Sequence, residues 1–284
     1  MPLEILSTGS GIALQDGGRR GWLRYGVPAG GAMDRHAMHA ANRLLGNKAD
    51  APVVEVLMQG ARFRATDDLW VALAGADSCS LVAAWSAKKV RLGEVLEFSK
   101  KAVGLFAYLA VPGGFQAEHW FGSVSADPRN GLGKIIRKGD IVEPSARQPG
   151  LSTGGIGRRL LIEEERRKYL SKEYFSLLPG PQFELFSAQA REALVVSEWM
   201  VSPKSDRTGY RLQGPSISVP DSIPSEPVLP GSFQVPGNGK PIITMVDGPT
   251  VGGYPKIAVL KDVDRDRLAQ CAPGTQLFFK WADS

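Results

Sequence analysis

The sequence is poor in cysteine and lacks long apolar runs. Cys79 and Cys271 are the only cysteines among its 284 residues. Both lie in apolar stretches, which favours two buried thiols in a reducing compartment over a disulfide. No apolar run approaches the roughly 20 residues that a membrane-spanning helix requires, and residues 1–4 lack the basic and apolar regions of a signal peptide. We therefore expect a cytoplasmic protein without a membrane segment.

Several common functional motifs are also missing. The formal net charge is +5, but no basic stripe with interleaved aromatic residues is present, so nucleic-acid binding is not expected. Gly239-Lys240 precedes Pro241, which excludes a P-loop, and no Gly-x-Ser-x-Gly elbow occurs. No segment resembles Ala-Met-Lys-Met, so the chain is not expected to carry biotin. His36 and His39 have a spacing that can bind a metal, but no third ligand lies near them in sequence, and no metal site is predicted.

The composition that remains is typical of a mainly β protein. Hydrophobic residues make up 43% of the chain, and 33 glycines and 20 prolines are spread along it, which favours a core of many short elements joined by turns. Short apolar runs rich in β-branched and aromatic residues predict strands. The predicted strands include residues 52–58, 69–74, 90–98, 105–111 and 276–281.

A few short helices are expected between the strands. They are predicted over residues 34–45 and 187–194, with a third beginning at residue 264. Asp34 and Ser187 are good N-cap residues, and Gly46 ends the apolar periodicity of the first helix. Residues 162–172 are dense in charge and could form a surface helix or a connector.

The chain is expected to have two lobes. Residues 146–157 are rich in glycine, proline, serine and glutamine, and charge clusters follow them, as is typical of a linker. We predict an N-terminal β lobe over residues 1–150 and a C-terminal β lobe over residues 175–284, with the linker near 150–175.

The first candidate site segment spans residues 15–34. Its glycines disfavour a regular element, and a fixed loop could offer backbone N–H groups and Arg19 to a carboxylate or phosphate. Alternatively, the glycines only shape tight turns and Asp16 pairs with Arg19. The residues themselves leave both possibilities open.

The second candidate segment spans residues 197–212. A strand up to Val201 is followed by a polar turn that contains Asp206, Arg207 and Arg211. The arginines could bind a planar anion through paired hydrogen bonds. An ion pair from Asp206 to Arg207 or Arg211 that stabilises the turn is an equally good interpretation.

The third candidate segment follows the apolar stretch 242–246. Adjacent glycines, Gly252 and Gly253, let the backbone approach a ligand closely, and a polar loop at the end of a buried strand is a frequent place for chemistry. Gln234, in a short strand between two prolines, could add an amide. The polar residues that flank the glycines are Asp247, Thr250, Tyr254 and Lys256.

Taken together, these segments resemble the biotin-dependent carboxyltransferase or allophanate hydrolase subunit 2 family. The family includes the third subunit of bacterial ATP-dependent 5-oxoprolinase, part of urea carboxylase and the antagonist of a sporulation-kinase inhibitor. The resemblance covers nearly the whole chain, in order. It rests on Gln15-Asp16-x-Gly18-Arg19-x-Gly21, Gly31-Ala32-Met33-Asp34, Ala41-Asn42-Arg43-Leu44-Leu45-Gly46-Asn47, Leu178-Pro179-Gly180-Pro181-Gln182, Ser205-Asp206-Arg207-x-Gly209-Tyr210-Arg211, Gln234-Val235-Pro236 and Gly252-Gly253-Tyr254-Pro255-Lys256.

The resemblance implies a two-lobed, cyclophilin-like β-barrel architecture and partner subunits. The implied partners are an allophanate hydrolase subunit 1-type protein and a lactam-utilisation-type subunit. The implied activity is ATP-driven opening of a small cyclic amide, 5-oxoproline to glutamate, with ATP bound with or by the partners. The alternatives are a non-catalytic binding or regulatory subunit, or carboxyl transfer from carboxybiotin as in urea carboxylase.

The resemblance also implies which residues line a cleft between the lobes. Asp247 is expected to act as a base or orienter, Lys256 and the arginines to hold anions, and backbone amides to stabilise a developing oxyanion. The predicted catalytic residues are Asp247, Lys256 and Tyr254. The predicted substrate-binding residues are Gln15, Asp16, Arg19, Asp206, Arg207, Gln234, Thr250, Gly252 and Gly253.

The sequence departs from the family pattern at three points. Gly248-Pro249-Thr250-Val251 stands where the family has a glutamine and a second threonine. Val124 replaces an arginine between Ser123 and Ser125, and Pro227 follows Ser225-Glu226 where the family has glycine. These losses suggest an altered substrate or a subunit that binds without catalysing.

Overall fold

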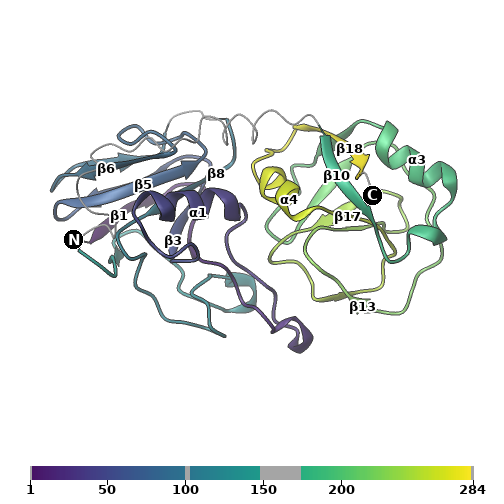
Figure 1. The fold of residues 1–284 in the computed structure, drawn as a ribbon, viewed down its shortest axis with the longest axis horizontal. Helices are drawn as coiled ribbons and strands as arrows, with labels where there is room; N and C mark the ends of the chain where they lie inside the picture. Colours follow the sequence, from purple (N-terminus) through teal and green to yellow (C-terminus); the bar gives the residue numbers. More distant parts are fainter. Residues whose placement is uncertain (1, 100–102, 148–173, 283–284) are drawn as a thin grey trace. The chain divides into compact units, whose positions relative to one another are not determined.

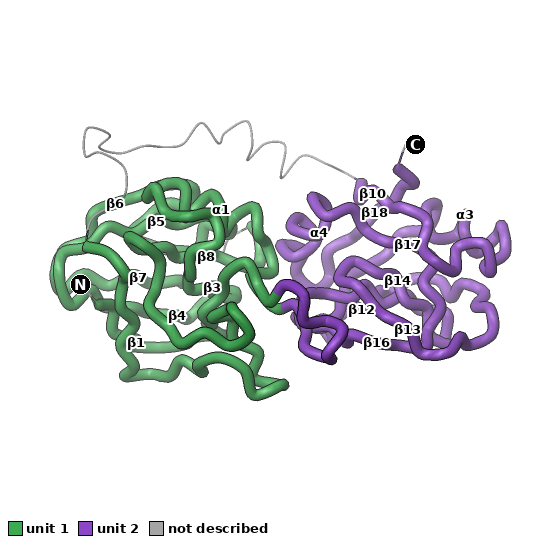
Figure 2. The backbone as a smooth tube through the Cα atoms, turned by 60° about the horizontal axis from the view of Figure 1, so that its bottom comes forward, with its two compact units in different colours: residues 1–19, 30–167 green, residues 20–29, 168–284 purple. Residues whose placement is uncertain are grey.

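The chain forms two compact units that are built mainly from β-strands (Figure 1, Figure 2). The computed structural model describes residues 2–99, 103–147 and 174–282. The first unit contains residues 1–19 and 30–167, and the second unit contains residues 20–29 and 168–284. Within the described ranges, no helix is both long enough and apolar enough to cross a membrane.

The first unit contains two antiparallel sheets. One has the strand order β7-β4-β1-β9 and the other the order β2-β3-β8-β5-β6. The elements are β1 (Leu3–Thr8), β2 (Ile12–Gln15), α1 (Arg35–Leu44), β3 (Val53–Leu57), β4 (Ala61–Ala65), β5 (Leu69–Gly75), β6 (Ser86–Val90), β7 (Val95–Glu97), β8 (Phe106–Ala110), the 3-10 turn η2 (Pro128–Asn130) and β9 (Ile141–Val142).

Side-chain alternation explains which face of each strand is buried in this unit. In β4 the apolar residues Ala61, Phe63 and Ala65 are buried, whereas Arg62 and Arg64 are exposed, as expected for a strand with one face on the core. The central strand β8 is buried at every position. Helix α1 packs against β5 and β8.

The second unit is a closed seven-stranded barrel with the order β10-β17-β14-β15-β12-β11-β18. Parallel pairing of β18 with β10 closes it, and Phe233 and Phe279 meet edge to face inside it with ring centroids 5.1 Å apart. The elements are η1 (Leu23–Tyr25), β10 (Tyr174–Pro179), η3 (Phe183–Leu185), α3 (Ala188–Val196), β11 (Trp199–Val201), β12 (Gly209–Gln213), β13 (Glu226–Pro227), β14 (Ser232–Gln234), β15 (Ile242–Thr244), β16 (Val251–Gly252), β17 (Lys256–Leu260), α4 (Asp262–Ala269) and β18 (Gln276–Trp281).

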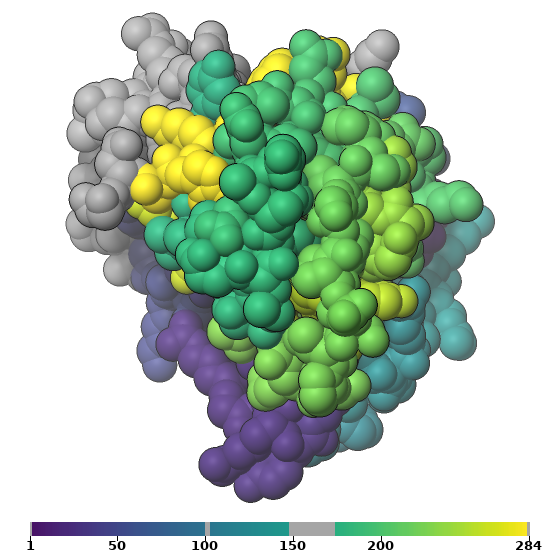
Figure 3. All heavy atoms as spheres, turned by 90° about the vertical axis from the view of Figure 1, so that its right-hand side faces the viewer, coloured from purple at the N-terminus to yellow at the C-terminus, as the bar shows by residue number. Residues whose placement is uncertain are grey.

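Two features of the second unit lie outside the barrel ladder. Strands β13 and β16 form a separate two-stranded sheet, in which Glu226 lies opposite Gly252. Helix α3 lies at the surface that faces the viewer in Figure 3, and it buries only Ala190 and Leu194.

The predicted mainly β fold with a barrel is confirmed, and one predicted strand is wrong. The segment 276–281 forms β18 as expected. The segment 90–98 is instead divided between β6 and β7. A turn interrupts it because the Glu94 carboxylate accepts the Arg91 N–H at 2.7 Å and Gly93 has a φ of 84°.

The three predicted helices are present, and the caps of the first two are confirmed. The Asp34 side chain accepts the Ala37 N–H, and the Ser187 side chain accepts the Ala190 N–H. The third helix begins at Asp262 rather than Asp264. The Asp264 carboxylate binds Arg267 and the Ser176 N–H instead of capping the helix. Residues 162–172 lie outside the described residues, as does most of the predicted linker.

Candidate functional site

The predicted site residues belong to both units, and the second unit brings three of them together. Gln234 on β14 and Lys256 on β17 are paired across the two antiparallel strands, at a register shift between Phe233 and Gln234. Both side chains are buried. Bulges of this kind often lie next to functional sites, where they redirect side chains.

Gly252 approaches the Gln234 amide closely. A methyl group added at Gly252 would lie 2.7 Å from Gln234 Nε2. The other end of the amide is held in place, because Gln234 Oε1 accepts a hydrogen bond from Thr244 Oγ1 at 3.3 Å. The absence of a side chain at Gly252 therefore keeps space beside a buried amide donor.

Lys256 is paired with a residue that sequence reasoning did not select. Its Nζ lies 2.5 Å from Glu226 Oε1 on β13. Gln182, after β10, donates from Nε2 to the same Glu226 oxygen at 2.8 Å and accepts the Lys256 backbone N–H at 3.0 Å. Lys256 and Gln182 together lower the pKa of the Glu226 carboxyl.

The remainder of the diglycine loop is held mainly by backbone contacts. The carbonyl of Thr250 accepts the Val228 N–H at 2.9 Å, and the carbonyl of Gly253 accepts the Ile223 N–H at 3.3 Å. Tyr254 is 49% exposed. Backbone hydrogen bonds therefore hold the loop in place, and the Tyr254 side chain is about half exposed to solvent.

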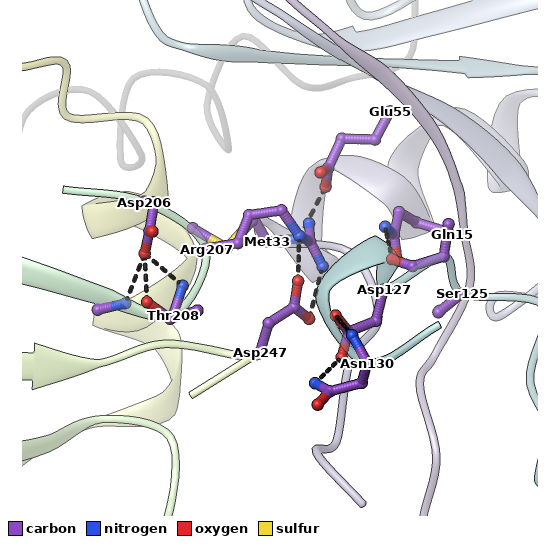
Figure 4. Close-up of polar contacts among 12 residues, drawn as sticks. Gln15, Met33, Glu55, Ser125, Asp127, Asn130, Asp206, Arg207, Thr208 and Asp247 are labelled. Carbon is purple, nitrogen blue, oxygen red and sulfur yellow. Dashed lines mark hydrogen bonds and ion pairs between the residues drawn. The ribbon is translucent and has the colours of Figure 1, made fainter. Parts of the chain in front are cut away.

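Arg207 and Asp247 form a second polar group in this unit (Figure 4). Arg207 Nε and Nη2 lie 2.6 and 3.1 Å from the two Asp247 oxygens, in a paired arrangement. Asp206 binds its own turn, since its carboxylate accepts the N–H and hydroxyl of Thr208. The sequence offered Arg207 and Arg211 as ion-pair partners of Asp206. In the structure Arg207 binds the carboxylate of Asp247, which is 40 residues away in sequence.

Asp16 organises the predicted loop of the first unit. Its Oδ1 accepts the hydroxyls of Ser123 and Ser125 at 2.5 and 2.6 Å, and its Oδ2 accepts the Val124 N–H at 2.8 Å. The Gly18 N–H also binds Oδ1. A carboxylate with this many donors is well satisfied inside the protein, which fits an anchoring role for Asp16.

Gln15 and Arg19 are buried beside the same segment. Gln15 Nε2 donates to the Ala126 carbonyl at 3.1 Å, and the Arg19 guanidinium donates to the Ser125 carbonyl. Val124, at the position of the family arginine, is also buried. The predicted anion-binding role of Arg19 remains a prediction, as do the other assigned site roles.

A buried hydrogen-bond network near α1 was not anticipated from the sequence. Glu55 Oε2 accepts the Met33 N–H and the Tyr108 hydroxyl, both at 2.9 Å, and the Tyr108 oxygen accepts the Asp34 N–H at 2.8 Å. Figure 4 shows the contact between Met33 and Glu55. Burial, followed by the nearby Glu55 and Asp34 carboxylates, raises the pKa of Tyr108 well above its usual value. The network fixes the start of α1.

The two histidines of α1 have separate surroundings. His39 Nε2 lies 2.9 Å from Asp50 Oδ1, whereas the His36 ring packs beside Trp85. Across the part of the chain that the structure describes, no group of three His, Cys, Asp or Glu residues is arranged to hold a metal ion.

Glu226 and Gln182 are the two functional candidates that sequence reasoning missed as site residues. Both stand in segments that carry the family resemblance or a departure from it, but neither segment shows that they meet. Gln182 and Glu226 are 44 residues apart, and Gln182 and Lys256 are 74 apart.

Comparisons with known proteins agree with this architecture. The family model of the carboxyltransferase domain, subdomains A and B, matches residues 25–281. A 5-oxoprolinase subunit of Escherichia coli is 34% identical over 284 residues, covering 98% of this chain and 90% of that protein. Urea amidolyase of Lachancea kluyveri is 27% identical over 306 residues, covering 97% of this chain but only 17% of that protein. The crystal structure of TTHA0988 matches with a TM-score of 0.85 and 31% identity, over 98% of this chain and 55% of that one.

Proposed function

Since this chain belongs to the carboxyltransferase-domain family, subdomains A and B, we propose that it is a subunit of an ATP-dependent 5-oxoprolinase. The complex would open the lactam of 5-oxoproline to glutamate. One water is consumed in opening the lactam and one in hydrolysing ATP to ADP and phosphate. Similarity over 90% of the length of a bacterial 5-oxoprolinase subunit supports this role.

The structural observation that carries the proposal is the buried Lys256 ammonium opposite Gln234, beside Gly252. A buried cation and an amide donor next to a glycine can hold an anionic oxygen of a small substrate. We assign Lys256 this role. Asp247 already uses both carboxylate oxygens to bind Arg207, so we assign it an orienting role rather than that of a general base.

ATP and the remaining catalytic groups are proposed to come with partner subunits. We propose an allophanate hydrolase subunit 1-type protein and a lactam-utilisation-type protein as those partners, in the cytoplasm. ATP would drive the reaction because amide resonance stabilises the lactam, and phosphorylation of its carbonyl oxygen would make the carbon electrophilic.

The test is reconstitution of the complex and measurement of 5-oxoproline-dependent ATP hydrolysis together with glutamate formation. Lys256→Met is expected to reduce kcat/KM at least 100-fold, which corresponds to about 2.7 kcal/mol of transition-state stabilisation. Lys204→Met is the matched control, because Lys204 is an exposed lysine of the same unit. An assembled complex inactive toward 5-oxoproline would contradict the proposed function, whereas full activity of Lys256→Met would contradict only the role assigned to Lys256.

A second candidate function is a subunit that binds without catalysing, and Gly248 favours it. A methyl group at Gly248 would collide with the Thr244 side chain and approach the Thr208 carbonyl to 2.8 Å. Gly248 begins the segment that departs from the family pattern, and the surrounding atoms leave no space for a side chain there. Tight binding to the subunit 1-type partner without turnover of lactams would support this alternative. Transfer of carboxylate from carboxybiotin to urea would instead indicate urea carboxylase-like chemistry.

A further inference from the structure

Two hydrogen-bond donors in the second unit converge on one carboxylate oxygen. Lys256 Nζ and Gln182 Nε2 lie 2.5 and 2.8 Å from Glu226 Oε1. The Gln182 amide is oriented for this contact, because its own oxygen accepts the Lys256 backbone N–H at 3.0 Å. An ammonium and an oriented amide that share one acceptor are the arrangement expected of a carboxylate-binding site.

The two charges of this ion pair differ strongly in exposure. The Lys256 side chain is 2% exposed and the Glu226 side chain is 37% exposed. Lys256 Nζ is ion-paired with Glu226 and forms no hydrogen bond that meets geometric criteria among the described residues. A buried ammonium requires a counterion, since an unpaired buried charge is strongly destabilising. The carboxylate, by contrast, can move into water at low cost.

The two partners are also held by different parts of the fold. Lys256 lies on the barrel strand β17, which is paired on both sides. Glu226 lies on the two-residue strand β13, which is paired with β16 outside the barrel ladder. The cation is therefore anchored in the rigid framework, and its counterion belongs to a short peripheral element that can move more easily.

We propose that Lys256 Nζ and Gln182 Nε2 form a carboxylate subsite that Glu226 occupies in the unliganded chain and that a small carboxylate ligand occupies after displacing Glu226. The exchange conserves the buried ion pair, because one carboxylate replaces another, and it releases Glu226 to solvent. Gln234, opposite Lys256, lies next to this subsite in the strand pairing. The identification of the ligand as 5-oxoproline rests on the proposed function, whereas the subsite itself does not.

The direct test removes the resident carboxylate and supplies a free one. In the isolated full chain, Glu226→Ala is expected to have a melting temperature that acetate raises in a saturable manner. The wild-type chain should not respond measurably at the acetate concentrations that half-saturate Glu226→Ala, because acetate has to displace Glu226 and therefore binds more weakly. The double variant Glu226→Ala with Lys256→Met should also show no response. Acetate that stabilises the double variant equally, or that fails to stabilise Glu226→Ala, would overturn the proposal.

Glu184→Ala is the matched control for this experiment. Glu184 also forms an ion pair, 2.8 Å from Arg191 in the same unit, but its side chain is 80% exposed. Its removal leaves no buried cation, so acetate should have no effect. Saturable stabilisation of Glu184→Ala by acetate would show that the response is non-specific and would overturn the assignment.

A conservative variant provides a second measurement if Glu226→Ala does not fold. Glu226→Gln keeps the side-chain shape but replaces the competing anion with a neutral amide. Acetate, measured by isothermal titration, is expected to bind this variant about tenfold more tightly than it binds the wild-type chain. Equal or weaker binding would overturn the proposal.

The identity of the ligand is tested separately with 5-oxoproline and 2-pyrrolidinone, which lacks the carboxylate. Glu226→Ala is expected to bind the first and not the second. If it binds acetate through Lys256 while the complex shows no 5-oxoproline turnover, the subsite stands and the proposed function fails. If the complex turns over 5-oxoproline with a KM that Lys256→Met leaves unchanged, the function stands and the subsite is overturned.

Discussion

At the scale of single residues, Gly252 determines how much space the Gln234 amide has. Gly252→Ala would place a methyl carbon 2.7 Å from Gln234 Nε2, so the amide has to move. We expect a loss of about 1–3 kcal/mol in the free energy of unfolding and a higher KM for 5-oxoproline in the reconstituted complex. Urea denaturation and steady-state kinetics measure the two effects.

Gly237→Ala is the matched control for that substitution. No atom lies within 4 Å of a methyl group added at Gly237, and Gly237 does not have a positive φ. Its effect on the free energy of unfolding should stay within about 0.5 kcal/mol. Equal losses in the two variants would show that the Gln234 contact is not responsible.

The Glu226 carboxyl makes a prediction about acid stability. Lys256 and then Gln182 lower its pKa from the ordinary value of 4.5. The ion pair therefore stabilises the folded state above pH 4.5, and this contribution disappears as the pH falls through the lowered folded-state pKa. The difference in unfolding free energy between wild type and Glu226→Gln should shrink over that acidic range, as measured by urea denaturation at a series of pH values. A difference that is independent of pH would contradict the ion pair. Because Glu226 is partly exposed, solvent screening keeps the effect small.

At the scale of elements, helix α4 is attached to the barrel through buried charges. Asp264 Oδ1 binds Arg267 at 2.7 Å, its Oδ2 accepts the Ser176 N–H of β10, and the Arg267 guanidinium lies over the Phe175 ring. Asp264→Asn should cost about 3–5 kcal/mol in unfolding free energy, because it removes the charge of a fully buried carboxylate that is ion-paired with Arg267. Chemical denaturation followed by circular dichroism measures this loss.

Asp262→Asn on the same helix provides the comparison. Asp262 lies 3.1 Å from Arg265 but its side chain is 74% exposed, so the loss should be about 0.5 kcal/mol or less. If the two substitutions destabilise the protein equally, burial of the Asp264 pair does not anchor α4.

At the scale of the whole molecule, each unit carries one cysteine that can report on its folding. Burial raises the pKa of Cys271 in the second unit to about 12 and also raises the pKa of Cys79 in the first unit. Cys271 is partly buried and Cys79 is buried, and the raised pKa leaves less thiolate at neutral pH than a free thiol has. Both thiols should therefore react with Ellman's reagent far more slowly in the native protein than in concentrated urea.

Single-cysteine variants distinguish unfolding of the first unit from unfolding of the second. Cys79→Ser leaves the thiol of the second unit, and Cys271→Ser leaves that of the first. In each variant, rapid labelling should begin at the urea concentration at which the corresponding unit unfolds. Rapid labelling of Cys271 under native conditions would contradict its raised pKa.

Local features of the sequence determined the starts of two helices, most of the strands and the family of this protein. Capping is a contact between neighbours in the chain, so Asp34 and Ser187 could be recognised as the starts of α1 and α3. Runs of β-branched and aromatic residues predicted most of the strands, because strand propensity is also a property of neighbouring residues in the chain. The ordered motifs predicted the family, which the family model confirms. The break at residues 91–94 was missed because a single turn around Gly93 overrides the apolar pattern on both sides.

Only the tertiary structure decided which polar groups meet. Lys256 is opposite Gln234 because of the β14–β17 register, and it reaches Glu226 because β13 pairs with β16. Arg207 likewise binds Asp247, a residue 40 positions away in sequence. Contacts between residues 30 to 74 positions apart depend on strand register and barrel closure, and these are properties of the packed fold that no local pattern contains.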